Sequence, residues 1–547
     1  MKKIAFVLLI VMALSALLTF AACTIKPTIT PDPFEEYKKA ENFTYYRSMT
    51  MNSEKKLLVF GRSESLSAEQ KIAAEAIQGI FARTNAKYYY YRNNYEVWTT
   101  DLTKNFGITF EDVTFAQMLD DFKTNYGNKY VLYDGRNNVE SLNCASTVAG
   151  ACDMIPVDVA IEDYFKVAGF EKGEDVTAMT EAKCFAKYKD MLNNDALVQI
   201  NNGGFNDQMR DYGIACKYLF FWPKNMEDTS VMKFRAEVLA WAKEDSPIFG
   251  WVPNDEAIDV AIASNYGKFT IASDFCTNMS VFTCKNAFGE LRFKQTNKTS
   301  NVVAEQGKHY ICIMMSDGDN VQTWYNNFAT NTKYMGAERG DFPMGWSIQP
   351  SLTDLAPNIL NYIYKNADKN DYYVCSVSGQ GYMNPQTYSD LGSFIGGLDL
   401  YMNRADLSVV QILDAGPSDK VTQMYSLVPS VKGGIYCYGM KYAEGAGSVY
   451  WANDKPFVSV RETLWDANVE SMAERINKYA TDPTNITGYT AINLHPWSMD
   501  YSDVKKLVSL LDDHVVVVTA DDFIRLITEN VPHFDVTLPY TDYSVGN

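Results

Sequence analysis

Short apolar runs alternate with amphipathic stretches through the first half of the chain. Leu57–Phe60 is one such run, and a helical pattern of apolar residues opens at Ser67, where Gln70 completes a capping-box signature. Similar runs predict strands at Lys129–Asp134, Met154–Val157, Leu197–Ile200, Lys217–Phe221, Phe249–Val252 and Lys268–Ile271. Short buried strands that alternate with helices are typical of parallel α/β layers. We therefore expect two or three small α/β subdomains over residues 51–300.

A more regular rhythm follows the polar stretch Gln295–Gly307, which we interpret as a connector. Apolar runs then predict strands at Tyr310–Ser316, Gly345–Gln349, Tyr372–Ser378, Val409–Asp414, Gly434–Tyr438, Phe457–Arg461, Tyr489–Leu494 and Val515–Thr519. Helical segments fit between most of them. This repeat predicts a C-terminal (β/α)8-like barrel, regular or distorted, over residues 301–535, with a tail at 536–547. An α/β architecture with fewer strands is the alternative.

The N-terminus has the pattern of a secretory leader. Two lysines precede the apolar run Ile4–Phe20, which is followed by two alanines and Cys23. A cysteine in this place resembles the bacterial lipobox, although Phe20 stands where that motif usually has Leu. We expect a lipoprotein signal peptide at 1–22, a lipidated Cys23 and a tether at 23–50. The protein would then be anchored to the bacterial cell membrane on its extracytoplasmic side; ordinary cleavage before a free Cys23 is the alternative.

Charge excludes one class of partner. The chain has 547 residues and a formal net charge of −18, which becomes −20 when a leader with two lysines is removed. Such a surface repels phosphate backbones, and no cluster of Lys and Arg along the sequence counters the repulsion. We therefore expect no nucleic-acid partner.

Cysteine and histidine usage argues against a metal site. The chain has 10 cysteines, and the odd number left after lipidation of Cys23 indicates no disulfide framework. It contains no C-x-x-C motif, and its four histidines, at positions 309, 495, 514 and 533, include no pair one helical turn apart. We expect no zinc site and no cofactor.

Polar and acidic residues recur at the ends of the C-terminal strands, where a barrel builds its active site. Asp317 comes directly after the first strand, a place from which a carboxylate can act as acid, base or nucleophile. The predicted catalytic residues are Asp317, Asp319, Glu462 and His495. The predicted substrate-binding residues are Asn320, Trp346, Gln349, Gln380, Tyr382, Arg461, Trp497 and, from the N-terminal region, Glu256.

These residues also have structural interpretations. Asp319, with Gln322 three positions later, fits a helix N-cap. Glu462 and Arg461 form either a simple ion pair or a functional one, in which the guanidinium lowers the pKa of the carboxylate. His495 suits a hydrogen-bonded structural role as well as a catalytic one. Tryptophans near the strand ends stack on sugars or pack in the core.

Several segments resemble one known family. Residues 379–385 are GQGYMNP, 316–320 are SDGDN, 345–350 are GWSIQP, and 250–256 are GWVPNDE. HPW at 495–497 followed by VVVVTADDF at 515–523 extends the similarity. Together they resemble the GxGYxYP putative glycoside hydrolases, secreted bacterial proteins with α/β N-terminal regions and a barrel-like C-terminal domain. Asn384 stands where the motif has its second Tyr. The resemblance implies carbohydrate chemistry and does not identify a reaction.

Three functions follow as hypotheses. The first is a glycoside hydrolase that acts on an extracellular poly- or oligosaccharide through carboxylates at the barrel rim. The second is a polysaccharide deacetylase-like hydrolase, which would need metal ligands that the histidine spacing does not supply. The third is a glycan-binding surface lipoprotein without catalysis, because aromatic, acidic and amide side chains serve binding as readily as catalysis.

Overall fold

The computed structural model describes residues 45–201, 203, 208–296, 302–316, 320–326 and 334–533, with the side chain of Asn320 excepted. The predicted leader, Cys23, most of the predicted tether and the tail lie outside these residues. Among the described helices, none is both long and apolar enough to cross a membrane. The nine cysteines from Cys144 to Cys437 are free thiols.

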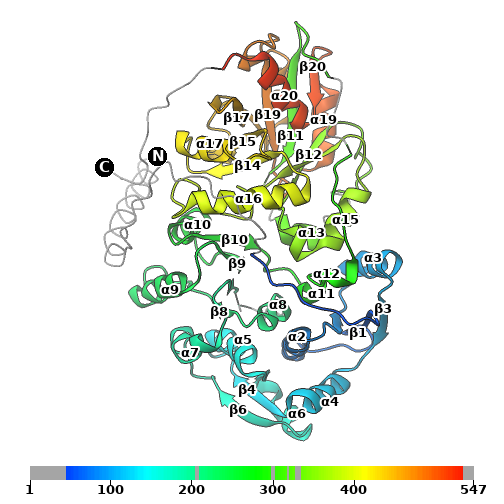
Figure 1. Ribbon diagram of the computed structural model, residues 1–547, viewed down its shortest axis with the longest axis vertical. Coiled ribbons are helices and arrows are strands. Elements are labelled where there is room, and N and C mark those ends of the chain that lie inside the picture. Colours follow the sequence, from blue (N-terminus) through cyan, green and yellow to red (C-terminus); the bar gives the residue numbers. More distant parts are fainter. Residues whose placement is uncertain are drawn as a thin grey trace.

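Three small parallel sheets make up the N-terminal half, in the lower part of Figure 1. The first has the order β2-β1-β3 and the second β5-β4-β6, while the third has four strands in the order β10-β9-β7-β8. Their strands are β1 (Lys56–Phe60), β2 (Tyr88–Tyr90), β3 (Thr109–Asp112), β4 (Lys129–Tyr133), β5 (Ile155–Asp158), β6 (Glu171–Asp175), β7 (Leu197–Gln199), β8 (Leu219–Phe221), β9 (Ser246–Gly250) and β10 (Lys268–Ala272). The predicted mixed α/β fold with parallel sheets is confirmed.

Helices connect and cover these sheets. They are α2 (Ala68–Ala82), α3 (Glu96–Phe106), α4 (Phe115–Tyr126), α5 (Glu140–Cys152), α6 (Glu162–Val167), α7 (Glu181–Tyr188), α8 (Arg210–Ala215), α9 (Thr229–Trp241), α10 (Glu256–Asn265), α11 (Met279–Phe282) and α12 (Lys285–Phe288). The predicted capping box opens α2: Gln70 N–H donates to Ser67 Oγ (3.2 Å), and Ser67 N–H donates to Gln70 Oε1 (3.0 Å). Two orphan backbone donors are thereby satisfied.

The C-terminal half contains one ten-stranded sheet, in the upper part of Figure 1. Its order is β16-β17-β15-β14-β13-β12-β11-β19-β18, and β20 pairs with β11 off this path. The strands are β11 (His309–Met315), β12 (Met344–Ile348), β13 (Asp371–Cys375), β14 (Val409–Asp414), β15 (Gly433–Tyr438), β16 (Val449–Ala452), β17 (Lys455–Ser459), β18 (Glu462–Leu464), β19 (Tyr489–Leu494) and β20 (Val515–Val518). Each predicted strand is present, and the pairings are parallel except that of β16 with β17.

The helices that follow these strands lie mostly on the outer side of the sheet. They are α13 (Asn320–Tyr325), α14 (Leu352–Leu355), α15 (Pro357–Lys365), α16 (Leu391–Ala405), α17 (Asp419–Ser426), α18 (Val469–Ile476), α19 (Tyr501–Ser509) and α20 (Ala520–Asn530). Side chains such as Ile313 and Val410 pack with them in the main core, whereas their chain neighbours Cys312 and Val409 belong to a second core with α20. Strand alternation therefore gives the sheet two buried faces.

This sheet curls strongly. Gln411 on β14 donates from Nε2 to Asn493 Oδ1 on β19 (3.4 Å), although three strands separate β14 from β19 in the sheet order. Between β17 and β18, Val460 N–H donates to Tyr436 O on β15 (3.2 Å) and Arg461 N–H donates to Ala491 O on β19 (3.0 Å). The chain therefore passes from β17, near one end of the sheet order, to β18, at the other end, through Val460 and Arg461. A regular (β/α)8 barrel is not confirmed.

Helix α20 fills the amino-terminal mouth of the curled sheet. Its Phe523 ring lies edge-on to Tyr489, the first residue of β19, with ring centroids 5.8 Å apart. Asp521 accepts hydrogen bonds from Tyr372 Oη (3.2 Å) and from Lys432 Nζ (3.0 Å). These partners lie at or just before the beginnings of their strands, so α20 covers the amino ends of the strands. The carboxyl end of the concave face is therefore the end that α20 leaves open.

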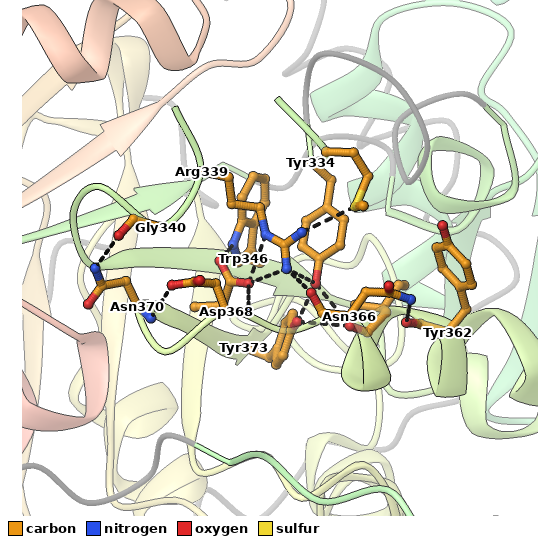
Figure 2. A network of polar contacts seen from close by, with 12 residues as sticks. Tyr334, Arg339, Gly340, Trp346, Tyr362, Asn366, Asp368, Asn370 and Tyr373 are labelled. Atoms are coloured by element: carbon orange, nitrogen blue, oxygen red, sulfur yellow. Dashed lines mark hydrogen bonds and ion pairs between the residues drawn. The ribbon is translucent and has the colours of Figure 1, made fainter. Parts of the chain in front are cut away.

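A polar network holds the loop before β12 at the amino side of the sheet (Figure 2). Arg339 donates from Nε to Asp371 Oδ2 (2.9 Å), and Trp346 donates from Nε1 to Asp371 Oδ1 (2.8 Å). Asp368 N–H also donates to Asp371 Oδ2 (2.7 Å), and the Arg339 guanidinium lies 4.0 Å from the ring centre of Tyr334. The carboxylate of Asp371 therefore joins β12, β13 and the loop.

Candidate functional site

Polar side chains gather on the concave face in the carboxyl half of the strands. Gln411 on β14 accepts from Ser376 Oγ at its Oε1 (2.6 Å) and donates to Asn493. Ser347 on β12 donates from Oγ to the backbone oxygens of Met315 (2.7 Å) and Ser316, at the end of β11. Residues from β11, β12, β13, β14 and β19 therefore meet inside the curl, just above the core that packs on α20.

Several buried polar atoms at these strand ends have no hydrogen-bond partner among the described residues. They are Ser316 Oγ, Gln349 Oε1, Gln380 Nε2, Thr463 Oγ1 and Asn493 Nδ2. Buried donors and acceptors are normally satisfied, and each unsatisfied group carries a free-energy cost of about 1–3 kcal/mol. Unsatisfied buried polar atoms also lie in other parts of the molecule, and these five are the ones at or just beyond the carboxyl side of the C-terminal strands. The chain continues from Ser316 into Asp317 at this end.

His495 and Trp465 form a stacked pair at the carboxyl rim. They follow β19 and β18 in register, and their rings are parallel to within 1°, with centroids 3.8 Å apart. His495 Nδ1 is 2.9 Å from Ser498 Oγ, and His495 N–H donates to Leu464 O (3.0 Å). The pair presents a fixed aromatic and imidazole surface at the predicted end of the sheet.

Asp414 is a buried carboxyl group at the end of β14. Its Oδ2 accepts from Tyr436 Oη (2.6 Å), and its Oδ1 accepts from Gln386 Nε2 (3.0 Å) and Ala415 N–H (2.8 Å). Burial raises the pKa of Asp414 to about 7, against the lowering effect of these hydrogen bonds. By strand alternation this side chain lies on the outer side of the sheet, with Ile412 and Tyr436, whereas that of Gln411 faces inward.

Glu462 differs from its predicted arrangement. It begins β18 and does not end the preceding strand, so its side chain points to the outer side, toward α18. There it accepts two hydrogen bonds from Arg475, at 2.6 and 3.1 Å, and one from Tyr479 Oη. The predicted ion pair with Arg461 is wrong: the Arg461 guanidinium lies 3.6 Å from the ring centre of Tyr479 and donates to Thr487 O (3.2 Å). This bidentate pairing favours a structural role for Glu462.

The GQGYMNP segment joins the two halves of the molecule. Tyr382 N–H donates to Thr270 O (2.7 Å) and Thr270 N–H donates to Tyr382 O (2.8 Å), which ties the segment to β10. The Tyr382 ring lies edge-on to Trp251 at 4.9 Å, and a Cβ on Gly381 would lie 2.6 Å from Thr270 O. Gly379 has a φ of +119°, which favours glycine. The glycines therefore permit a close approach of the two backbones.

The remaining predicted residues are scattered. Trp346 is 1% exposed and bound to Asp371 in the core, so this position does not fit its predicted contact with a sugar. Gln349 and Gln380 are buried and linked to each other: Gln349 Nε2 donates to Gln380 O (2.5 Å). Trp497 is 57% exposed at the carboxyl rim, beyond β19.

The other predicted residues lie in the N-terminal half or outside the residues that the structure describes. Glu256 is exposed at the first turn of α10, in the N-terminal half. Asp317 and Asp319 lie outside the described residues, as does the side chain of Asn320. The convergence of Asp317 with His495 therefore stays a prediction, and Glu462 faces away from the concave surface.

Three polar residues that face inward from the sheet were not among the predicted site residues, and we call them the inward polar set. Ser347, Gln411 and Asn493 each interrupt an apolar strand, and each is at most 2% exposed. A polar residue inside an apolar strand was the available signal, because it implies a buried hydrogen-bonding environment. In the part of the chain that the structure describes, no group of three or more His, Cys, Asp or Glu side chains is placed to hold a metal ion.

Comparison with known proteins gives three family matches and one solved structure. The model of the GxGYxYP putative glycoside hydrolase C-terminal domain matches residues 307–528, that of the GxGYxYP third domain matches 194–284, and that of the first domain matches 56–124. A crystal structure of a putative hydrolase from Bacteroides thetaiotaomicron VPI-5482 is 25% identical, with a TM-score of 0.81 over 91% of this chain and 99% of that chain. No curated protein in the comparison matches the chain.

Proposed function

Because the chain belongs to the family of GxGYxYP putative glycoside hydrolases, we propose that it hydrolyses glycosidic bonds in a poly- or oligosaccharide at the carboxyl end of its curled sheet. The observation that carries this proposal is the match of residues 307–528 to the C-terminal domain of that family, whose curled sheet holds the stacked His495 and Trp465 rings at its carboxyl rim. We treat the curled sheet as a distorted relative of the (β/α)8 barrel, in which active sites occupy the carboxyl ends of the strands.

Glycoside hydrolysis needs two carboxyl groups with different roles. Asp414 suits neither role, because its side chain lies on the outer side of the sheet with Ile412 and its partner Tyr436, although burial raises its pKa to about 7. Asp317, which follows Ser316 directly, and Asp319 beside it are our candidates for the pair of carboxyl groups. A separation of ~5–5.5 Å between the two carboxyl groups would suit a retaining enzyme and ~6.5–9.5 Å an inverting one.

The rim supplies groups suited to sugar binding. The stacked His495 and Trp465 rings and the exposed Trp497 offer aromatic faces, on which pyranose rings can pack. We further propose that the lipid on Cys23 anchors the enzyme outside the cytoplasm, where polymeric glycans are encountered.

The first experiment is a screen of the purified protein against a panel of glycans, with released reducing ends and released acetate measured in parallel. Reducing ends without acetate support the glycosidase. Acetate release that chelation with EDTA abolishes and zinc restores would instead favour the deacetylase-like alternative. Binding of a glycan without either product would favour a binding protein.

Asp317→Asn tests the role of this carboxylate on the substrate so identified. Asn is nearly isosteric with Asp but cannot ionise, so we expect turnover to fall at least ~100-fold while glycan affinity changes little. Asp163→Asn is the matched control, because the Asp163 side chain is 97% exposed on α6. Full turnover by the Asp317 variant would exclude this residue from the chemistry, and loss of folding would support a structural role for the SDGDN segment.

A further inference from the structure

A large cavity lies away from the carboxyl rim, where the N-terminal segment meets both halves of the molecule. Its volume is about 960 Å³, within the usual range for sites that bind small molecules. The wall is formed by residues 45–49, the ends of α2 and α8, the beginning of β9, and α12 and α16. In Figure 1 the segment before β1 runs from beside β9 to the first sheet.

The charge of this wall is opposite to that of the whole chain. The chain has 49 Lys and Arg against 67 Asp and Glu. The basic residues of the wall are Arg47, Arg83, Lys217, Lys243, Lys285 and Arg404. Its acidic residues are Asp195, Glu244 and Asp245. Because the basic residues come from six separate segments, the fold and not a local run of sequence assembles this positive surface.

Part of this positive charge is neutralised within the protein. Arg47 pairs with Asp195 at 2.8 Å. Arg83 pairs with Asp153 and donates to the carbonyl oxygens at the ends of α5 and α8. Lys285 and Arg404 share a single carboxylate, Asp354, which lies outside the wall.

Two lysines of the wall have no counter-charge among the described residues, and Arg404 has one guanidinium nitrogen without a hydrogen-bond acceptor there. Within the described residues, neither the half-buried Lys217 nor the exposed Lys243 has a carboxylate within ion-pair distance. Burial and the neighbouring Arg83 lower the pKa of Lys217, as expected for a cation without a counter-charge. Arg404 Nη1 is buried without a hydrogen-bond acceptor and lies 3.6 Å from Asp354. Such donors are costly unless a ligand supplies acceptor oxygens.

We infer that this cavity binds an acidic oligosaccharide, whose carboxylate or sulfate groups are held by Lys217, Lys243 and Arg404. The cations supply charge-assisted hydrogen bonds to anionic oxygens, which are stronger than bonds between neutral groups. The cavity has room for more than a single small anion. The choice of a sugar as the ligand rests on the proposed function, whereas the need for an anion rests on the cavity itself.

The test is calorimetric titration of the purified protein with trigalacturonate, with neutral maltotriose and with sodium sulfate. We expect trigalacturonate to bind at least about tenfold more tightly than maltotriose, and its affinity to fall as salt rises. Sulfate alone should bind more weakly than trigalacturonate, because it occupies only part of the cavity. Equal affinity for the acidic and neutral sugars, or no binding of trigalacturonate, would overturn the inference.

Variants that remove cavity lysines test whether trigalacturonate binds in this cavity. Lys217→Gln with Lys243→Gln should weaken trigalacturonate binding about tenfold, and Lys217→Arg with Lys243→Arg should restore most of it. The matched control is Lys183→Gln with Lys233→Gln, which removes two exposed lysines on α7 and α9. Equal losses in the control and the cavity variant would overturn the inference. Asp317→Asn should bind trigalacturonate normally, so the cavity and the catalytic proposal can fail separately.

Discussion

The raised pKa of Asp414 results from burial that outweighs hydrogen bonding. Three donors stabilise its charged form, yet the loss of water around the carboxyl group outweighs them and raises its pKa to about 7. The ordinary value is 3.8. The folded protein therefore binds the Asp414 proton more tightly than the unfolded chain does, and this difference makes stability depend on pH.

We predict that Asp414→Asn removes this dependence. Stabilisation by the bound proton is fully present below the unfolded pKa near 4 and is lost as the pH rises through 7, so the wild-type free energy of unfolding falls across this window. One proton contributes at most ~1.4 kcal/mol per pH unit, and Asn resembles the protonated form at every pH. Urea denaturation at pH 5 and pH 7.5 should show the variant losing less stability than the wild type. Asp513→Asn, at an exposed position, should retain the wild-type slope; the same slope in the Asp414 variant would contradict the raised pKa.

At the scale of elements, the loop before β12 depends on the buried pair of Arg339 and Asp371. The side chains are 9% and 1% exposed. Arg339→Met would leave the Asp371 carboxylate with its bonds from Trp346 and Asp368 but without its counter-charge. We predict a loss of about 3 kcal/mol in the free energy of unfolding, measured by urea denaturation.

A surface pair in the same region gives the control for this prediction. Lys505 and Asp341 are 3.0 Å apart, with side chains 55% and 49% exposed. Because water screens such a pair, Lys505→Met should cost less than about 1 kcal/mol. Equal losses from the two variants would show that burial does not distinguish the pairs.

The elements themselves could be predicted from the sequence, but their curvature and pairing could not. Apolar runs located the strands of the C-terminal half because burial on both faces of a parallel sheet leaves a local signal. The contact between Gln411 and Asn493 joins residues 82 positions apart, and no local pattern reports it. Glu462 pairs with Arg475 and not with its chain neighbour, because the break between β17 and β18 turns its side chain toward α18.

The candidate site was predictable to a similar extent. The rule that active sites lie at strand carboxyl ends predicted a site at the end of the sheet opposite the mouth that α20 closes, and this location stays a prediction. The rule did not indicate which side chains turn inward. The contact of Gly381 with β10 has no local signal in the sequence, because Thr270 lies more than 100 positions away.

At the scale of the whole molecule, the contact of the GQGYMNP segment with β10 couples the C-terminal half to the N-terminal half. Two backbone hydrogen bonds join Tyr382 to Thr270, and the Trp251 ring packs on Tyr382. The seam can form only because Gly381 has no side chain: a Cβ there would lie 2.6 Å from Thr270 O and 3.0 Å from a ring carbon of Phe269. Backbone atoms of a strand cannot move aside as the end of a flexible side chain can.

We therefore predict that Gly381→Ala separates β10 from the GQGYMNP segment while each half keeps its fold. Overpacking of this kind costs about 1–3 kcal/mol, and the amide protons of Tyr382 and Thr270 should exchange with solvent faster than in the wild type. Gly150→Ala is the control, because a Cβ on α5 would meet its neighbours at an ordinary 3.5 Å and alanine favours the helix by up to about 1 kcal/mol. Hydrogen exchange followed by mass spectrometry compares the three proteins. Unchanged exchange at the seam in Gly381→Ala would mean that the two halves are held together by other contacts, and faster exchange throughout would mean that the seam is part of one cooperative unit.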